Sequence, residues 1–173
     1  MGEFYQVLRR WIFYIMLDTK KFKIIIESTP LVSIDLCIVF DSQILLGKRK
    51  NEPLKGLWFT PGCRILKNET WQDCLRRVAN SELNFEVRDP NQFLLMGVWD
   101  HFYKNSAVDE GVSTHYVNLP HCIYLKQKPN FQIDEQHDEI SWFDLQEVSS
   151  SGEFHEYMRN YASWLIKADI DND

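Results

Sequence analysis

The residues best suited to chemistry lie between positions 61 and 85, where a turn leads into a helical pattern. Pro61 and Gly62 punctuate the chain at the turn, and the segment that follows carries Arg77 and Glu82. Carboxylate and backbone carbonyl oxygens are the ligands that hard cations prefer, and a guanidinium can bond two phosphate oxygens at once. This stretch therefore indicates a site that holds a metal ion and a phosphate together.

The helix expected in this stretch has a recognisable start and end. Thr70 can cap its first turn, with Asp73 three residues further on, and Asn84 can end it in the left-handed conformation. Its apolar residues recur at helical spacing, at Trp71, Leu75, Val78 and Ala79. The pattern predicts that one face of this helix is buried while the turn before it stays near the surface.

A second polar stretch, DEQHDE, occupies positions 134–139. His137 within it can accept a proton from water near neutral pH, because the ordinary pKa of histidine is about 6.5. The neighbouring carboxylates of Glu135 and Asp138 would raise its basicity. The alternative is a solvated turn between two strands, which is the commoner role of six consecutive polar residues.

Residues 61–85 resemble the Nudix box, G-x5-E-x7-R-E-U-x-E-E-x-G-U, in which U is aliphatic. Glu69, Arg77 and Glu82 fall in register with it, and the chain departs from it at Cys63, Val78, Ser81 and Asn84. One Nudix subfamily, the GDP-mannose mannosyl hydrolases, similarly keeps only the last glutamate of the helix. The strings S-T-P-L-V-S, L-L-G-K-R, D-E-Q-H-D and H-F-Y favour this subfamily, and the resemblance covers about residues 16–165.

The resemblance implies one Mg²⁺ ion per subunit, with Mn²⁺ as a substitute. Its ligands would be the carboxylate of Glu82, the amide oxygen of Gln136 and the backbone carbonyl of Gly62. Taken alone, a single glutamate on a helix is more often a solvated side chain. If Cys63 had to adopt a positive φ where the box has glycine, it would add about 1–2 kcal/mol of strain.

The resemblance also assigns the catalytic groups. His137 matches the general base of the subfamily, and Arg49, Arg64 and Arg77 match positions that bind the diphosphate or stabilise its departure. A planar, permanently charged guanidinium suits that role. For Arg77 a salt bridge to Glu69 is an equally good interpretation.

Further positions match residues that contact the substrate in the subfamily. Asp35, His101 and Tyr116 match residues that reach the sugar or the β-phosphate; ordinary hydrogen-bonded polar groups on strands are the alternative. The positions that contact the guanine base, partly across a dimer interface, correspond to Met16, Leu17 and Phe22. A homodimer is therefore expected.

The elements that must position these residues follow from periodicity and turn signals. Helices are expected at 16–26, after residue 70, from about residue 144 and at 154–168. Strands are expected at 31–40, 43–49, 57–60, 93–103, 112–125 and 140–143, and Pro120 places part of one strand at an edge or a bulge. This order predicts an α/β fold with a mixed β-sheet sandwiched between α-helices, as in Nudix proteins.

Residues 16–173 are expected to form a single Nudix domain. Residues 1–15 are interpreted as a dispensable N-terminal extension, or as the product of an upstream start codon; an extra surface helix is the alternative.

Composition narrows the classes of function. A chain of 173 residues that is 45% hydrophobic fits one folded domain, and its formal net charge of −6 argues against non-specific nucleic-acid binding. Four separated cysteines, without a C-x-x-C pair, favour reduced thiols in a cytoplasmic protein. The apolar run at residues 11–17 is too short to span a membrane.

Together these observations imply Mg²⁺-dependent hydrolysis of GDP-mannose, with GDP-glucose as a second expected substrate. The expected products are GDP and the free sugar, formed by inverting attack of water at the anomeric carbon. Two alternatives remain open. One is a conventional Nudix pyrophosphohydrolase acting on a nucleotide sugar, and the other is a non-catalytic module that binds sugar nucleotides.

Overall fold

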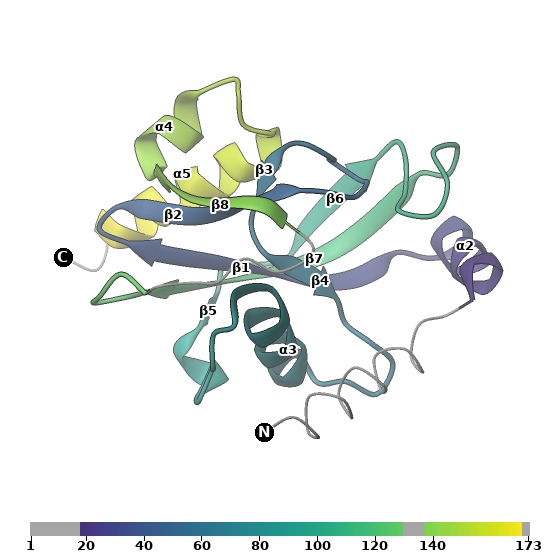
Figure 1. The fold of residues 1–173 in the computed structure, drawn as a ribbon, viewed down its shortest axis with the longest axis horizontal. Coiled ribbons are helices and arrows are strands. Elements are labelled where there is room, and N and C mark those ends of the chain that lie inside the picture. Colours follow the sequence, from purple (N-terminus) through teal and green to yellow (C-terminus); the bar gives the residue numbers. More distant parts are fainter. Residues whose placement is uncertain (1–17, 130–136, 171–173) are drawn as a thin grey trace.

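The computed structural model describes residues 18–129 and 137–170, which form one sheet with helices on both faces (Figure 1). The helices are α2 (Thr19–Ser28), α3 (Trp71–Leu83), α4 (Leu145–Ser150) and α5 (Glu156–Ile170), with a 3-10 turn, η1 (Pro90–Gln92). The strands are β1 (Leu31–Phe40), β2 (Gln43–Arg49), β3 (Trp58–Phe59), β4 (Gly62–Arg64), β5 (Leu94–Leu95), β6 (Trp99–Tyr103), β7 (Thr114–Tyr124) and β8 (His137–Asp144). The predicted mixed sheet between helices is confirmed.

The sheet is built around β1. This strand pairs in parallel with β7 and antiparallel with both β2 and β4. β8 and β3 pair with β2, and β5 and β6 pair with β7. Because β4 and β7 are both partners of β1, residues from three separate parts of the sequence meet along this one strand.

The β1–β2 hairpin has the bounds that the sequence predicts. Asp41 and Ser42 have φ values of 48° and 57°, as a two-residue turn with two left-handed residues requires. Phe40 pairs with Gln43 directly across the turn. The turn therefore fixes the register of both strands.

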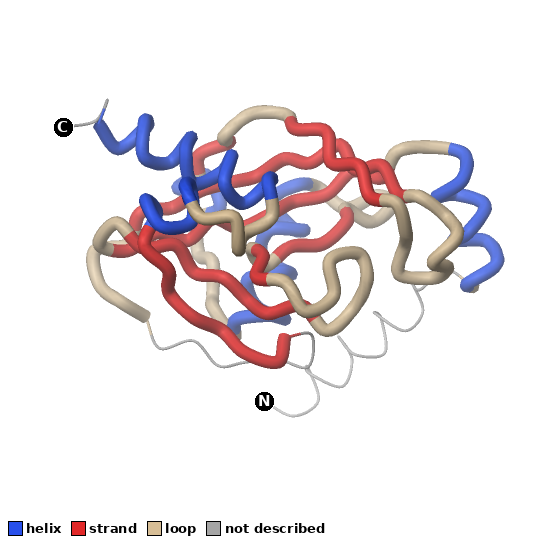
Figure 2. Tube along the Cα trace, turned by 90° about the horizontal axis from the view of Figure 1, so that it is seen from above, coloured by secondary structure: helices blue, strands red, loops and turns tan. Residues whose placement is uncertain are grey.

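Each face of the sheet has its own core. On one face, α3 buries Leu75, Val78 and Leu83 against Ile34 and Leu36 of β1. On the other face, α4 and α5 cover the sheet, and α5 buries Met158, Tyr161 and Leu165. Figures 1 and 2 show α5 lying across the strands and α3 on the opposite side. Burial of each large apolar side chain contributes about 1.5–3 kcal/mol, so the two cores fix both helices on the sheet.

The ends of α3 are also as predicted. The Thr70 hydroxyl accepts a hydrogen bond from the backbone N–H of Asp73 at 3.2 Å and donates one to its carboxylate at 2.7 Å. Asn84 ends the helix in the left-handed conformation, with φ of 49°. Because both caps are local, α3 begins and ends where the sequence signals place it.

The prediction of one strand over residues 93–103 is wrong. β5 ends at Leu95 and β6 begins at Trp99, with Gly97 at φ 129° between them. Pro120 does not place part of β7 at an edge, since β7 pairs on both sides. The predicted irregularity is present, because the register shifts by one residue opposite Pro120, between the Leu95–His121 and Trp99–Asn118 pairs. Pro120 is tolerated because it lies opposite the break between β5 and β6, where no N–H is required of it.

Other bounds differ by a few residues. The helix expected at 16–26 is described over Thr19–Ser28, with Asp18 as its N-cap, and the closing helix is displaced by two residues. The last strand is longer than predicted, and β4 was not predicted.

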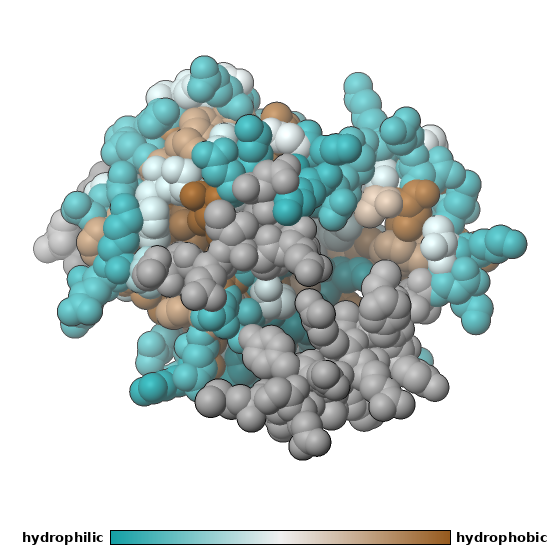
Figure 3. All heavy atoms as spheres, in the orientation of Figure 1, coloured by the Kyte–Doolittle hydropathy of each residue, from teal (hydrophilic) through white to brown (hydrophobic). Residues whose placement is uncertain are grey.

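Hydrophilic side chains dominate the described part of the face in Figure 3. No helix in the ranges 18–129 and 137–170 is long and apolar enough to cross a membrane.

Candidate active site

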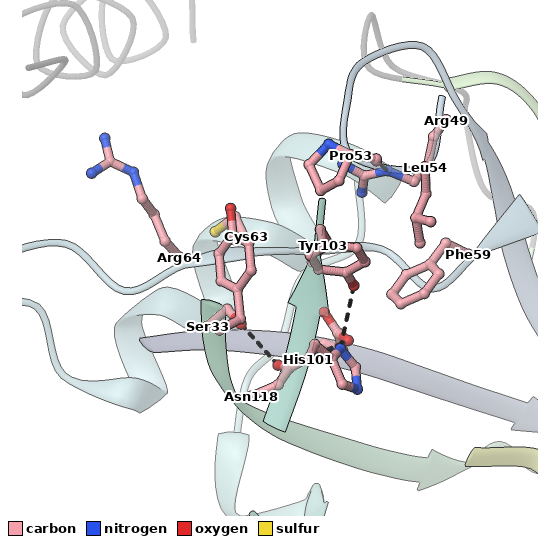
Figure 4. A pocket seen from close by; sticks show the side chains of 13 residues that line it. Ser33, Arg49, Pro53, Leu54, Phe59, Cys63, Arg64, His101, Tyr103 and Asn118 are labelled. Carbon is pink, nitrogen blue, oxygen red and sulfur yellow. Dashed lines mark hydrogen bonds between the residues drawn. The ribbon is translucent and has the colours of Figure 1, made fainter. Parts of the chain in front are cut away.

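A pocket opens where β1, β4, β6 and β7 meet the loop that follows β2 (Figure 4). Six of the predicted site residues line it: Asp35, Arg49, Gly62, Arg64, His101 and Tyr116. Strand pairing explains this convergence. Asp35 lies opposite Gly62 of β4, and Leu31, four residues earlier on β1, lies opposite Tyr116 of β7. Tyr116 in turn lies opposite His101 of β6.

Asp35 is the buried acid of this pocket. Tyr161 donates a hydrogen bond of 3.0 Å to its carboxylate, and the side-chain amide of Asn118 donates a second, short one. Burial raises the pKa of Asp35 to about 6, although Asn118, Tyr161 and the charge of Arg49 act in the opposite direction. The carboxylate is thus held by the protein but poorly solvated.

His101 is buried beside Asp35 and belongs to the same network. Its Nε2 lies 3.3 Å from the Tyr161 hydroxyl, and its Nδ1 lies 3.3 Å from the Asn118 amide nitrogen. The ring stacks on Tyr157 with centroids 3.8 Å apart. Burial lowers the pKa of His101 to about 4, so the imidazole is neutral at pH 7 and acts through hydrogen bonds rather than charge.

Position 62 requires a glycine, because the backbone there lies too close to Asp35 to leave room for a side chain. A Cβ atom at position 62 would lie 2.3 Å from Asp35 Oδ1 and 2.6 Å from the carbonyl oxygen of Ile34. The backbone N–H of Gly62 donates to Glu82 Oε2 at 3.2 Å, which joins β4 to α3. Two of the three predicted metal ligands, Gly62 and Glu82, therefore lie side by side.

The donors described at this position suit a hard cation. Glu82 is 1% exposed and offers a carboxylate, and Gly62 offers a backbone carbonyl. Both are oxygen donors, so they fit Mg²⁺ better than a soft metal. In the part of the chain that the structure describes, no three His, Cys, Asp or Glu residues group as metal ligands. The third predicted ligand, Gln136, lies outside the described residues.

The two positions of α3 that depart from the Nudix box contribute no carboxylate. Val78 is fully buried in the core, and the Ser81 hydroxyl donates to the Val78 carbonyl at 3.5 Å. The carboxylate of Glu69 is engaged elsewhere, by Arg77 and by the N–H of Leu66. Glu82 is consequently the carboxylate that α3 places against Gly62.

Arg77 forms the salt bridge that was the alternative interpretation for it. Its Nε and Nη2 atoms donate to the two carboxylate oxygens of Glu69 at 2.6 and 2.8 Å, and Nη2 also donates to the Arg64 carbonyl at 3.0 Å. Burial opposes this charge, but the bond to Glu69 and nearby negative groups raise the pKa of Arg77. A catalytic role for Arg77 stays a prediction.

The other two arginines are placed at the pocket itself. Arg49 lines it at the end of β2, where its Nε donates to the Pro53 carbonyl at 2.8 Å. Arg64 extends from β4 (Figure 4). Its guanidinium lies 4.2 Å from the ring centre of Phe22 in α2. Phe22, predicted to contact the guanine base, and Arg64, predicted to bind the diphosphate, are therefore neighbours.

Cys63 departs from the box without backbone strain. It belongs to β4, pairs with Ile34 of β1, and is not among the residues with positive φ. Its thiol lies near that of Cys74, whose hydrogen bond, together with the charge of Arg77, holds the pKa of Cys63 below its usual range despite burial. The strain that a positive φ would cause at position 63 is therefore absent.

The residue predicted as the general base, His137, is only partly located. The backbone of His137 begins β8 and pairs with Arg49 of β2, which brings the start of β8 to the end of the strand that carries Arg49. Nothing further is described of the His137 side chain. Met16 and Leu17, predicted to contact the base, lie outside the described residues, as does the N-terminal extension at 1–15.

Several pocket residues were missed by the sequence reasoning. The Tyr103 hydroxyl lies 3.4 Å from His101 Nδ1, and Asn118 accepts a hydrogen bond from Ser33 at 3.0 Å (Figure 4). Strand alternation could have found Tyr103 and Asn118, since each lies two positions after a predicted residue on the same strand. Tyr161 had no such signal, because only tertiary packing brings α5 to the pocket.

Comparison with known proteins agrees with the fold described above. The NUDIX domain family model matches residues 30–165. The chain is 39% identical over 120 residues to the low-salt glycan biosynthesis protein Agl8 of Haloferax volcanii, which covers 69% of this chain and 74% of Agl8. It is 27% identical over 150 residues to an ADP-ribose pyrophosphatase of Methanocaldococcus jannaschii, covering 85% of this chain and 80% of that protein.

Solved structures agree. A MutT NUDIX hydrolase from Burkholderia pseudomallei superposes with a TM-score of 0.63 at 24% identity, over 79% of this chain and 98% of that one. The NUDIX domain of Shewanella oneidensis NrtR, solved with ADP ribose, gives a TM-score of 0.64 at 16% identity, over 88% and 93%. These likenesses support the fold.

Proposed function

The chain belongs to the Nudix family, and from this premise we propose that it hydrolyses GDP-mannose, and also GDP-glucose, to GDP and the free sugar. The proposal places the site in the pocket between β1, β4, β6 and β7. It takes water attack at the anomeric carbon, with inversion, as the chemical step. A homodimer with one Mg²⁺ ion per subunit is part of the same proposal.

One observation carries the proposal. The buried Asp35–His101 pair and the guanidinium of Arg49 line the same pocket, next to a helix that places a single carboxylate, Glu82, against Gly62. Attack at phosphorus in Nudix enzymes relies on a cluster of glutamates, whereas departure of a diphosphate needs mainly positive charge. A site with few carboxylates and several sugar-binding groups supports the second chemistry.

The protein's own residues supply most of the binding. Arg49 and Arg64 would pair with the diphosphate oxygens, because each keeps its charge and presents several donors. Asp35, His101 and Tyr116 offer an acceptor, a neutral imidazole and a hydroxyl, which together match the hydroxyl groups of a hexose. Phe22, stacked on Arg64, adds an aromatic face for the nucleobase.

The reaction breaks the bond between the anomeric carbon and the β-phosphate oxygen. His137 would take a proton from the attacking water, whose oxygen forms the new bond to carbon, and GDP would leave with the electron pair. Mg²⁺ held by Glu82, Gln136 and the Gly62 carbonyl would neutralise charge on the departing diphosphate. Because water and leaving group lie on opposite faces of the sugar, the configuration inverts.

A second candidate is pyrophosphate hydrolysis, which the relative named ADP-ribose pyrophosphatase favours. That reaction would release GMP and mannose 1-phosphate from GDP-mannose. The absence of carboxylates at Val78 and Ser81 argues against it. A third, non-catalytic binding, would give no product at all.

Product identification tests the proposal. The protein is incubated with GDP-mannose and Mg²⁺, and the products are separated by ion-exchange chromatography with enzymatic detection of mannose. GDP and mannose in equal amounts support the proposal. GMP with mannose 1-phosphate would support the pyrophosphohydrolase, and tight binding of GDP-mannose without any product would support a binding module.

A further inference from the structure

Two thiols face each other between the pocket wall and α3. The sulfur of Cys63, in β4, lies 3.8 Å from the sulfur of Cys74, in the first turns of α3. The Cys74 sulfur also lies 3.8 Å from the Arg64 carbonyl, so the helix packs directly on the β4 backbone. The two cysteines are 11 positions apart in sequence and are brought together by the turn between β4 and α3.

The two thiols differ in accessibility. Cys63 is partly exposed and lines the pocket, whereas Cys74 is fully buried behind it. A small reagent that enters the pocket can therefore reach Cys63, and Cys74 is then the neighbouring thiol that can react with the modified sulfur. This order of access is typical of an attacking and a resolving cysteine.

A metal ion shared by the two sulfurs is the other use of such a pair. The guanidinium Nη2 of Arg77 lies 3.5 Å from the Cys74 sulfur. A permanent positive charge at that distance opposes a cation between the sulfurs and stabilises negative charge on them instead. The surroundings therefore favour thiol exchange over metal binding.

We propose that Cys63 and Cys74 form a reversible disulfide that links the pocket wall to α3 when a small-molecule disulfide enters the pocket. Cys63 attacks one sulfur of the reagent, forms a mixed disulfide and releases one thiol. Cys74 then attacks the Cys63 sulfur and releases the second thiol. The protein loses two electrons and two protons, and the reagent disulfide gains both.

Closure of the link needs a modest movement. A disulfide is about 2.05 Å long, so the two sulfurs must approach by about 1.8 Å from their separation of 3.8 Å. β4 is only three residues long and is followed by the turn that leads to α3, so this approach involves the segment that joins the pocket wall to the helix. The movement would displace the pocket wall next to Gly62.

Mass spectrometry of the folded protein tests the proposal, with glutathione disulfide as the reagent. We expect the wild type to become lighter by two hydrogen atoms, and peptide mapping to join the segments with Cys63 and Cys74. Dithiothreitol should restore the original mass. Cys74→Ser should stop at a protein carrying one glutathione on Cys63, and Cys63→Ser should not react.

The chain offers a matched control. Cys37 and Cys122 are paired across β1 and β7, but both are buried in the core and the reagent cannot reach them. Cys37→Ser should therefore behave as the wild type. A wild type that keeps glutathione on Cys63 without closing, or that keeps both thiols free while iodoacetamide labels Cys63, would overturn the proposal.

Discussion

Replacement of Asp35 by asparagine tests the electrostatics of the pocket most informatively. Burial raises the pKa of Asp35 from 3.8 to about 6, so the folded protein disfavours its charged form. This shift in the pKa of Asp35 corresponds to about 3 kcal/mol of folding free energy. Asparagine can still accept the hydrogen bonds from Asn118 and Tyr161 through its amide oxygen, but it carries no charge.

The sign of the effect follows from the direction of the shift. A carboxyl with a raised pKa favours folding below the unfolded-state pKa, near 4, and this contribution is lost as the pH rises through about 6. Asp35→Asn should therefore match the wild type near pH 4 and exceed its stability by up to about 3 kcal/mol at pH 8. Activity should fall, because the pocket loses the negative charge and one of the two carboxylate oxygens of Asp35.

Urea unfolding at pH 4, 6 and 8 measures this difference directly. Burial lowers the pKa of His101 from 6.5 to about 4, so its contribution to folding stability is lost as the pH falls from 6.5 through about 4. Both proteins share this loss, so it largely cancels in the comparison. Asp41→Asn, a change in the exposed hairpin turn, serves as the control and should show no such pH-dependent gain. A variant that is less stable than the wild type at pH 8, or a difference independent of pH, would refute the reasoning.

Three further predictions follow from the same contacts. Gly62→Ala should destabilise the fold by about 1–3 kcal/mol and abolish activity, because its Cβ would collide with a backbone oxygen. Gly152→Ala, which has open space around it, should change neither property; urea unfolding and activity assays measure both. Arg77→Lys should lower the free energy of unfolding by about 1–2 kcal/mol through loss of the paired bonds to Glu69, while Arg76→Lys, in an exposed pair, should change it little. Protein oxidised with glutathione disulfide should hydrolyse GDP-mannose several-fold more slowly, with recovery in dithiothreitol; an unchanged rate in fully oxidised protein would separate the disulfide from any effect on turnover.

Features encoded by neighbouring residues could be predicted from the sequence. The hairpin at Asp41 and Ser42 and both caps of α3 depend on side chains within a few positions of the backbone they fix. The break between β5 and β6 depends on a partner strand far along the chain, so alternation of residues alone did not reveal it. For the same reason the sequence left open whether Pro120 lies at an edge or at an irregularity, since only the pairing of β7 with β5 and β6 decides it.

The candidate site divides in a similar way. Asp35 on β1 and His101 on β6 were predicted and meet in the pocket. The partners that hold them, Asn118 and Tyr161, are ordinary strand and helix residues until the sheet and α5 pack together. The salt bridge of Arg77 could be anticipated as one of two interpretations, but only the geometry showed that its donors bond Glu69.

The position of an ¹⁸O label tests the central claim most directly. GDP-mannose is hydrolysed with Mg²⁺ in ¹⁸O-enriched water, and both products are examined by mass spectrometry, with His137→Gln as a companion that should be much slower. The account predicts the label in mannose and none in GDP, because water attacks carbon. Label found only in a phosphate group would mean attack at phosphorus and would contradict it.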